Sequence, residues 1–394
     1  MPKAKEFVSL SCHIIWREKH CHRKQRREIF SVLALCPMAF LFMNKYSPYS
    51  LSFEELTSFE TLYKSHKIAR LSKRHKGEIV DFELHLATSL ANLEGRLKRG
   101  TYHISRYKKF YIYEPKEREI QALRYVDRVV QHSICDNFLT PYYSPRMIYA
   151  NCACQIGKGT RFARMLFKRY LVEHYKKHGM AGYFLKCDVK KYFANINHAL
   201  LKEQLKELPD QRVYKLLCNL IDSYHHKEGK GLPIGNQTSQ IFGVIFLDKL
   251  DRFIKERLQI KHYVRYMDDL VMICEDGKKL TQILNILREK IKEFKLEFNA
   301  KTQIIPIKNG IEFLGGRYYI VENGRIVLKV KKQSKDRLKR NIKRVTTLQN
   351  KGAVDNQYVN GFFAGYNGHL KDFNAYHLLL KVKNLKRKSE GEVK

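Results

Sequence analysis

Two adjacent aspartates stand in the middle of an apolar stretch, and this arrangement constrains the fold more than any other feature. Residues 262–273 read His-Tyr-Val-Arg-Tyr-Met-Asp-Asp-Leu-Val-Met-Ile, so strand-forming runs lie on both sides of Asp268 and Asp269. The pattern predicts a tight β-hairpin with the carboxylates at its tip and both arms buried. Neighbouring like charges disfavour each other's ionisation, whereas Mg²⁺ prefers carboxylate oxygens. The pair therefore indicates either a cation site or an exposed acidic turn.

A third aspartate ends another predicted strand, Tyr183 to Asp188, well before the hairpin. The intervening chain is long enough to form helices and return to the same sheet. If the strand end and the hairpin tip are neighbours, three carboxylates converge. Such a group can hold two metal ions about 3.5–4 Å apart for phosphoryl or nucleotidyl transfer. In the alternative, Asp188 only caps the segment that follows it.

The charge of the chain indicates the class of its partner. Its 394 residues include 75 Lys and Arg against 39 Asp and Glu, a net charge of +36. An excess spread along the whole length predicts a polyanion, and the 24 Tyr and 22 Phe suit a nucleic-acid groove. An anionic membrane is a weaker candidate. The nine cysteines form no regular framework, which indicates a reducing compartment, and Cys152 and Cys154 are interpreted as packing residues rather than zinc ligands.

Apolar spacing predicts the order of helices and strands. The predicted helices cover residues 82–97 with a stop at Gly100, 117–138, 200–226, 241–258 and 280–294. The predicted strands cover residues 107–113, 183–188, 303–307, 311–314, 317–321 and 325–330. Asn323-Gly324 predicts a two-residue hairpin turn between the last two strands. Near the N-terminus, the apolar run from Ile29 to Met43 is too short for a membrane span and is broken by Pro37. We interpret residues 1–42 as accessory or as an overextended reading frame, with Met43 as the alternative start.

Two basic segments are candidate contacts for phosphates. Residues 155–161 form a glycine-rich basic loop before a helix, and this loop lacks the Gly-x-x-x-x-Gly-Lys-Ser/Thr phosphate motif. It can hold phosphates through side chains and backbone N–H groups, or it can be a plain surface turn. Beyond residue 331, an amphipathic helix is predicted with a basic face that tracks phosphates or is simply solvated. That face carries Lys332, Lys335, Lys339, Arg340 and Lys343.

In this order, the segments resemble a reverse transcriptase of the bacterial, group II intron-like lineage. The resemblance covers about residues 60–385. Its marks are residues 124–143, 157–164, 183–197, 231–240, 266–269, Lys301 and 313–315. The resemblance implies an α+β right-hand polymerase fold. The implied divisions are an N-terminal extension over 1–60, fingers over 61–180, a palm over 181–330, a helical thumb over 331–385 and a basic tail over 386–394.

The resemblance also implies roles for individual residues. Asp188, Asp268 and Asp269 form the catalytic triad and, with the Val189 carbonyl, hold two Mg²⁺ ions, for which Mn²⁺ can substitute. The aromatic ring of Phe193 matches the family's steric gate against a ribose 2′-hydroxyl. The implied contacts to the incoming deoxynucleoside triphosphate (dNTP) are Lys158, Arg161, Phe193, Ile234, Gly235 and Lys301. The implied partners are a template RNA, a primer, the RNA–DNA hybrid and dNTPs, in the cytoplasm of a bacterium or from a phage gene.

One departure from most of the family concerns residues 234–240. Relatives with Gln-Gly-x-x-x-Ser-Pro have a glutamine where this chain has Ile234, and the Ile-Gly-x-x-x-Ser-Gln form resembles the enzymes of diversity-generating retroelements. Residues 368–376 are similar to the C-terminal sequence of that group. Because isoleucine can only pack, losing the glutamine's hydrogen bond could lower base discrimination about tenfold. The resemblance implies adenine-directed mutagenic DNA synthesis and a basic accessory variability protein. The alternatives are a neutral core substitution at Ile234, a retron or group II intron enzyme, and a non-catalytic RNA-binding scaffold.

Overall fold

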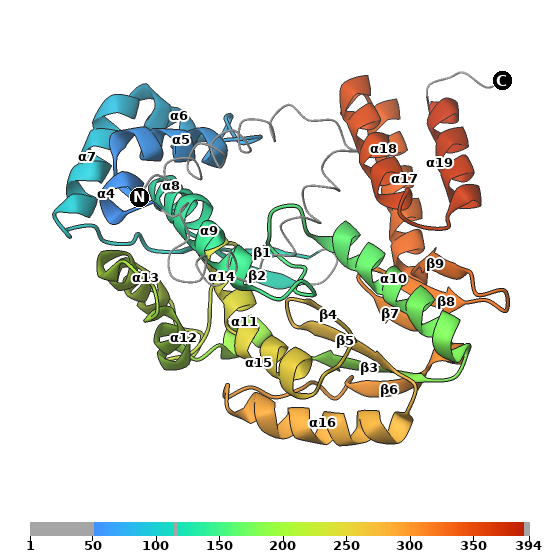
Figure 1. The fold of residues 1–394 in the computed structure, drawn as a ribbon. Helices are drawn as coiled ribbons and strands as arrows, with labels where there is room; N and C mark the ends of the chain where they lie inside the picture. The colour runs from blue at the N-terminus through green and yellow to red at the C-terminus, as the bar shows by residue number, and fades with distance from the viewer. Residues whose placement is uncertain (1–50, 114–116, 390–394) are drawn as a thin grey trace, which may run out of the picture. The chain divides into compact units, whose positions relative to one another are not determined.

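The chain divides into two compact units, Met1–Ser50 and Leu51–Lys394. In the computed structural model, the described residues are 51–113 and 117–389, all within the second unit (Figure 1). The predictions for residues 1–42 and for a start at Met43 therefore lie outside the described residues, as does the end of the basic tail. The second unit combines helices with antiparallel sheets, as the sequence predicts.

Four antiparallel strands form the central sheet, in the order β4-β5-β3-β6. They are β3 (Tyr183–Asp188), β4 (His262–Tyr266), β5 (Asp269–Cys274) and β6 (Gln303–Pro306). The hairpin predicted around the paired aspartates is formed by β4 and β5. The strand predicted to end at Asp188 is β3, and it pairs with β5 along its whole length. Both predictions are confirmed.

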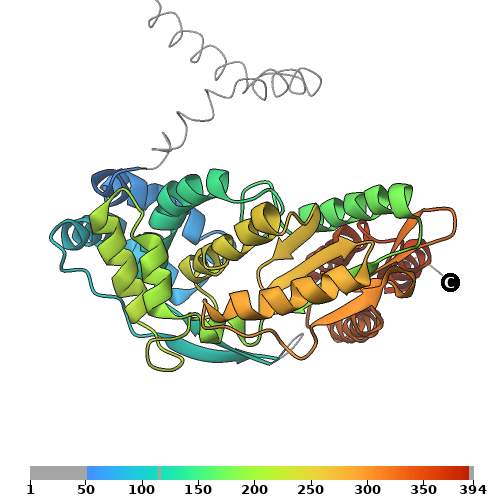
Figure 2. The same cartoon turned by 60° about the horizontal axis from the view of Figure 1, so that its bottom comes forward.

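Different helices cover the two faces of this sheet (Figures 1 and 2). Helix α16 (Gly277–Lys292) lies on the face of Tyr183, whose ring is so close to Gly277 that an added Cβ would be 3.0 Å away. Helix α10 (Thr160–His178) lies on the face of Phe184, and its Phe167 ring is 6.1 Å from the Phe184 ring. Because side chains alternate along a strand, Asp188 shares the face of Phe184. Helix α10 covers the opposite end of that face, through contacts with His262 and Gly182.

The N-terminal part of the unit is a layer of helices with one exposed ribbon. Its helices are α4 (Phe53–Leu56), α5 (Phe59–Ala69), α6 (Gly77–Leu84), α7 (Leu86–Lys98) and α8 (Tyr125–Ile134), followed by a π-helix (Cys135–Leu139). The single helix predicted over 82–97 is wrong, because His85, with φ −115° and ψ 33°, separates α6 from α7. The helix predicted from residue 117 also starts too early. Residues Arg118–Ala122 form β2, which pairs with β1 (Lys108–Ile112), so cross-strand pairing overrides the helical pattern there.

Short helices connect this layer to the central sheet. They are α9 (Thr140–Tyr143), a 3₁₀ turn (Ser144–Arg146), α11 (Tyr192–Asn195), α12 (His198–Leu205), α13 (Gln211–Asp222), α14 (Gln237–Ile245), α15 (Asp248–Arg252) and a π-helix (Phe253–Arg257). The helix predicted over 200–226 is two helices, because the Asp210 side chain caps a new one by accepting from the Arg212 and Val213 N–H groups. The helix predicted over 241–258 is likewise interrupted, at Leu247.

A second sheet and three helices complete the unit. The sheet contains β7 (Ile311–Phe313), β8 (Gly316–Ile320) and β9 (Ile326–Val330), and the helices are α17 (Lys332–Asn350), α18 (Asn356–Leu370) and α19 (Tyr376–Ser389). The hairpin predicted at Asn323-Gly324 is confirmed, but its turn has three residues rather than two. The Val321 N–H donates to the Arg325 carbonyl, and Gly324 takes the left-handed conformation at φ +75°. The apolar face predicted for α17 is buried, as Leu338, Ile342 and Val345 show.

Candidate functional site

The three predicted aspartates meet at one end of the central sheet. Asp188, the last residue of β3, lies directly opposite Asp269, the first residue of β5, so both side chains leave the same face. Asp268 lies in the turn between β4 and β5. The preceding residue, Met267, has φ +57°, a left-handed conformation that is uncommon for residues other than glycine. The Val189 N–H donates to the Asp268 carbonyl at 3.2 Å and ties the end of β3 to this turn.

Burial raises the pKa of both hairpin aspartates. The pKa of Asp269 rises to about 6, chiefly because its carboxylate is desolvated, although the Lys186 ammonium lies 3.7 Å from its Oδ1 and opposes the rise. The pKa of Asp268 is raised mainly by burial and further by the charge of Asp188, while backbone hydrogen bonding opposes both. The charge of Asp188 therefore disfavours the ionisation of Asp268 and Asp269, and a bound cation would relieve that repulsion.

The chemistry of these donors fits a hard divalent cation. The carboxylate oxygens are the ligands that Mg²⁺ prefers, and Oδ1 of Asp269 is buried with no hydrogen-bond donor. Asp188 is held in orientation by Asn299, whose Nδ2 donates to its Oδ2 at 3.0 Å. In the described part of the chain, no three His, Cys, Asp or Glu side chains are already arranged to enclose a metal ion. The residues that would supply ligands are adjacent, since Asp188 lies opposite Asp269 and the Asp268 turn is bonded to Val189.

A basic cavity of about 710 Å³ opens beside Asp188. Four cationic side chains line it: Lys186, Lys301, Arg317 and Lys331. An acidic residue, Glu312, organises two of them, because its carbonyl accepts from Lys186 at 2.7 Å and its carboxylate pairs with Lys331 at 2.9 Å. Of these four cations, Lys301 is among the residues predicted from the sequence, whereas Lys186, Arg317 and Lys331 are not. Lys186 carried a usable signal, since it lies two residues before Asp188 on the same face of a strand.

The Phe193 ring packs against helix α14. A Cβ added to Gly243 would lie 3.2 Å from Cζ of Phe193, so the ring is in close contact with the helix backbone. The Phe193 carbonyl accepts a hydrogen bond from the Leu232 N–H at 2.7 Å, which joins α11 to the loop over 231–236. This arrangement fixes the base of the ring, and its role as a steric gate stays a prediction.

Ile234 and Gly235 lie in a loop held against β2. The Ile234 carbonyl accepts from the Gln121 N–H at 2.9 Å. Gly235 has φ +123°, and an added Cβ would come within 2.9 Å of Ile120, so both conformation and space require glycine. The Ile234 side chain is 38% exposed, which rules out the alternative that it is a buried core residue. Its effect on base discrimination stays a prediction.

Lys158 and Arg161, the two basic residues of the glycine loop predicted to contact phosphates, differ in their contacts and in their exposure. The Lys158 ammonium donates to the carbonyls of Tyr149 and Asn151 at 3.2 and 3.0 Å, and burial lowers its pKa. The Arg161 side chain is 88% exposed and lies 3.4 Å from Asp372, in the turn between α18 and α19. Arg161 is therefore the more accessible of the two for a phosphate.

Of the two predicted packing cysteines, Cys152 is buried, whereas Cys154 is exposed, so that prediction is wrong for Cys154.

Comparison with known proteins decides the family. The sequence profile of the family described as reverse transcriptase (RNA-dependent DNA polymerase) matches residues 113–318, more than half of the chain. This chain belongs to the reverse transcriptase family. The match covers β3, the hairpin of β4 and β5, and the first residues of β8, so the family's right-hand polymerase fold with helices and antiparallel sheets applies to this reverse transcriptase.

Individual relatives of this reverse transcriptase are distant. It is 26% identical over 175 residues to the group II intron-encoded protein LtrA of Lactococcus lactis subsp. cremoris, covering 42% of this chain and 27% of LtrA. The same figures hold for LtrA of strain MG1363. The chain thus spans about a quarter of the length of these curated relatives.

Among solved structures, a telomerase from Candida albicans in complex with a telomeric RNA fragment aligns at a TM-score of 0.45 and 15% identity, over 64% of this chain and 49% of the telomerase. An apo telomerase from Candida tropicalis aligns at 0.43 and 15%, over 59% of this chain and 49% of its own. The family assignment rests on the sequence profile rather than on these structures.

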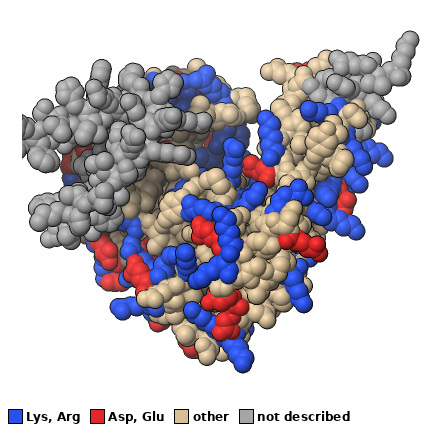
Figure 3. Space-filling model, turned by 45° about the vertical axis from the view of Figure 1, so that its right-hand side comes forward, with Lys and Arg blue, Asp and Glu red and all other residues tan. Residues whose placement is uncertain are grey.

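The basic helix of this reverse transcriptase presents most of its predicted contacts to solvent. On α17, Lys332, Lys339, Arg340 and Lys343 are exposed and Lys335 is half-buried. Lys and Arg side chains are spread over the face seen in Figure 3, with fewer acidic side chains between them. Such a surface suits a polyanion, as the net charge of +36 predicts. In the described part of the chain, no helix is long and apolar enough to cross a membrane.

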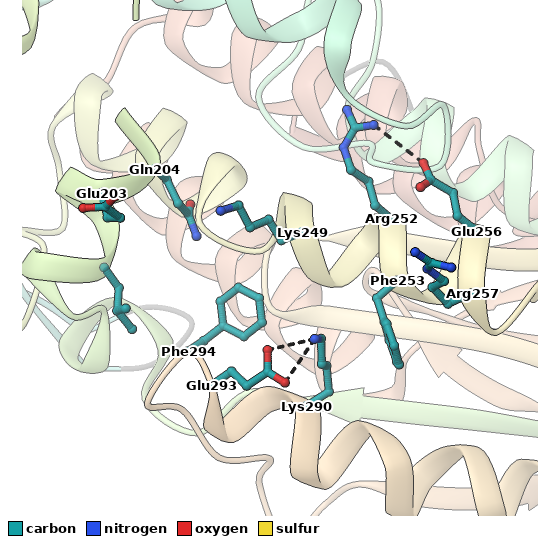
Figure 4. Close-up of a pocket in the computed structure, with 11 residues that line it drawn as sticks. Glu203, Gln204, Lys249, Arg252, Phe253, Glu256, Arg257, Lys290, Glu293 and Phe294 are labelled. Carbon is teal, nitrogen blue, oxygen red and sulfur yellow. Dashed lines mark hydrogen bonds and ion pairs between the residues drawn. The ribbon is translucent and has the colours of Figure 1, made fainter. Parts of the chain in front are cut away.

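A second cavity, of about 350 Å³, lies between α12, α15 and α16 (Figure 4). Its charged side chains largely neutralise one another. Lys290 pairs with Glu293 at 2.8 Å, and Arg252 pairs with Glu256 at 3.6 Å, while the Lys290 ammonium also lies over the Phe253 ring. Lys249 and Arg257 also line the cavity, and we assign it no function.

Proposed function

We propose that this reverse transcriptase copies an RNA template into DNA at the site formed by Asp188, Asp268 and Asp269. One observation carries the proposal: the sheet register places Asp188 opposite Asp269, with Asp268 in the adjoining turn, beside a cation-lined cavity. The membership of the chain in the reverse transcriptase family supports the same reaction. Burial raises the pKa of Asp268 and Asp269 although Lys186 lies beside Asp269, so a bound cation would favour the ionised carboxylates.

The chain's own residues would bind and orient the reactants. Bound divalent ions would supply activation of the primer 3′-hydroxyl and stabilisation of the departing pyrophosphate. Asp188 and Asp268 would hold the ions, with the Val189 carbonyl as a further ligand, while Asn299 keeps the Asp188 carboxylate oriented. The Lys186 ammonium lies 3.7 Å from Asp269 without a hydrogen bond to it, and Asp269 would bind the ions less directly than Asp188 and Asp268.

The remaining basic groups would bind phosphates. Lys301 lines the cavity beside Asp188 and would donate toward the departing pyrophosphate. Arg161 would contact the triphosphate, and Phe193 with the Ile234-Gly235 loop would enclose the sugar and base. The fingers would comprise residues 61–180, the palm 181–330 and the thumb 331–385, with the basic face of α17 on the RNA–DNA hybrid.

The deciding experiment replaces one carboxylate. Asp268→Asn should abolish primer extension on an RNA template and leave RNA affinity nearly unchanged, because the amide keeps the shape of the turn and removes the charge that holds the ions. Asp81→Asn, the same acidic-to-neutral change at a side chain that is 83% exposed and outside the site, is the control for altered net charge. Extension by the Asp268→Asn protein at the rate of the natural chain would remove this site from the proposal.

For the biological setting, we propose a diversity-generating retroelement. Ile234, where most relatives have glutamine, supports it, and this residue is 38% exposed and so open to contact with a substrate. The proposed partners are a template-repeat RNA, its primer and a small basic accessory variability protein. A group II intron enzyme is the second candidate, and the similarity to LtrA favours it.

A substitution and a genome observation distinguish these settings. Ile234→Asn should lower misincorporation opposite template adenine about tenfold by restoring a hydrogen-bonding group. Misincorporation opposite template cytosine measures the general change in fidelity. An unchanged adenine error would exclude position 234 as its determinant. A pair of adjacent repeats that differ at adenines near the gene would establish the retroelement, and an intron RNA around the gene would establish the alternative.

A further inference from the structure

A fully buried ion pair lies next to the turn between β4 and β5 that carries Asp268. Arg265, on β4, and Asp251, on α15, are both 0% exposed. The Arg265 Nε donates to Oδ1 of Asp251 at 2.7 Å, and its Nη2 donates to Oδ2 at 2.6 Å, so the pair is bidentate. The Tyr263 hydroxyl donates to the same Oδ1 at 2.6 Å. The Asp251 carboxylate is therefore fully used, and no substrate can reach it.

The same guanidinium reaches the turn that carries Asp268. Its Nη1 donates to the Met267 carbonyl at 3.0 Å, and its Nη2 also donates to the Val244 carbonyl of α14 at 2.9 Å. Met267 is the residue with φ +57°, a conformation that strains a residue carrying a side chain. A hydrogen bond to its carbonyl fixes the peptide unit that leads directly into Asp268. Arg265 thus joins a strained turn to two helices.

The backbone of Arg265 extends this brace to the glycine loop. Its N–H donates to the Ala150 carbonyl at 3.0 Å, and its carbonyl accepts from the Cys152 N–H at 3.0 Å. Between them, the Asn151 carbonyl accepts from the Lys158 ammonium at 3.0 Å. These hydrogen bonds therefore fix the segment before the glycine loop against β4, the strand that leads into the turn carrying Asp268.

Stability alone does not account for a buried ion pair. Desolvation of two charges offsets most of their attraction, and apolar residues of similar volume often stabilise a core equally well. What the guanidinium adds is direction, because its planar fork donates to four acceptor oxygens at once. We propose that the Arg265–Asp251 pair is a positioning device, which holds the Met267 peptide in its left-handed conformation and thereby aims the Asp268 carboxylate. Both residues act through Met267 and touch neither substrate nor metal.

The test removes the pair without leaving a charge buried alone. Arg265→Met combined with Asp251→Leu replaces both partners by apolar side chains, and Arg265→Lys keeps the charge but loses the fork. Tyr263→Phe is the matched control, because it removes a bond to the same Asp251 oxygen and leaves the bond from Arg265 to Met267. The measurements are the thermal transition, RNA affinity, kcat and KM for primer extension, and Mn²⁺ affinity of the protein without nucleic acid. Asp268→Asn identifies the Mn²⁺ bound at this site.

The double variant should keep its cooperative thermal transition and its RNA affinity. Its kcat should fall about 10- to 100-fold with KM nearly constant, and its Mn²⁺ affinity should fall by about tenfold or more. Arg265→Lys should show the same loss of Mn²⁺ affinity, and Tyr263→Phe should show neither loss. A double variant with unchanged kcat and Mn²⁺ affinity would overturn the proposal. Loss of RNA affinity and of the thermal transition in parallel with kcat would overturn it too, in favour of a purely structural pair.

The kinetic measurement rests on the proposed function, whereas the Mn²⁺ measurement does not. If the natural chain extends no primer, the proposed polymerase activity fails. The Mn²⁺ affinities of the natural chain, the double variant and Arg265→Lys then still decide whether the pair positions Asp268.

Discussion

Replacing Gly243 by alanine should move the Phe193 ring into the proposed nucleotide site. An added Cβ would lie 3.2 Å from Cζ and 3.3 Å from Cε1 of this ring, closer than ordinary contacts of 3.4–4 Å. The neighbouring Tyr192 ring is held in place, because its hydroxyl donates to the Gly243 carbonyl at 2.5 Å. Phe193 is only partly buried, so its ring should yield by a few tenths of an ångström, away from α14.

The expected effect on stability is small because two terms oppose each other. Alanine in place of glycine inside a helix favours folding by up to about 1 kcal/mol, and overpacking typically costs about 1–3 kcal/mol. Gly365→Ala is the matched control, since it makes the same change inside α18 with nothing within 4 Å of the added Cβ. That variant should gain stability and keep the kinetics of the natural chain.

Sugar selection is the informative measurement. If Phe193 is the steric gate, Gly243→Ala narrows the site, so the ratio of kcat/KM for a deoxynucleotide over its ribonucleotide should rise severalfold, and KM for the deoxynucleotide should rise with it. Phe193→Ala should lower the same ratio, and the double variant should behave as Phe193→Ala with the overpacking relieved. The reasoning is refuted if Gly243→Ala lowers stability while leaving the ratio at its natural value, and if Phe193→Ala also leaves it there.

Three further outcomes are expected. Because burial raises the pKa of Asp269 to about 6, the folded protein binds this proton more tightly than the unfolded chain does. In EDTA, the free energy of unfolding of the natural chain should therefore rise relative to that of Asp269→Asn as the pH falls from 7 toward 4. The expected gain is on the order of 3 kcal/mol, and a difference in thermal midpoint that does not change with pH would contradict it. Lys339→Gln and Lys343→Gln should each reduce the salt slope of RNA affinity by roughly 0.7–0.9, whereas unchanged slopes would place α17 away from the phosphates. Asp372→Asn should release Arg161 and lower KM for dNTPs by up to about fivefold, as an exposed ion pair allows, and Arg161→Ala should raise it; a KM indifferent to both changes would exclude Arg161 as a triphosphate contact.

Local patterns made the central sheet predictable. The aspartate pair between two apolar runs located the hairpin of β4 and β5, and the apolar run before Asp188 located β3, which pairs with β5. The errors came where tertiary pairing decides. Residues 118–122 carry no strong strand signal of their own, yet they pair with β1, and the helical spacing over 82–97 gives no warning of the break at His85.

The supporting residues of the site were less accessible to sequence reasoning than its aspartates. Lys186 could have been found from the two-residue period of a strand. Asp251 could not, because it lies on a helix whose distance from Arg265 depends on how the chain folds back. Asp372 meets Arg161 for the same reason, across more than half of the chain. A pattern in sequence identifies groups on one element, whereas contacts between elements depend on packing.

Helix α10 limits where residues can be inserted into this chain without disrupting its fold. Its Phe167 packs on both sheets, through Phe184 and Tyr318, while Arg164 donates twice to the Leu314 carbonyl and pairs with Asp372. One inserted residue would rotate all later positions of the helix by about 100° and separate these contacts. The end of β1 at Ile112, by contrast, belongs to a strand whose residues are all exposed and is the better position for an inserted label.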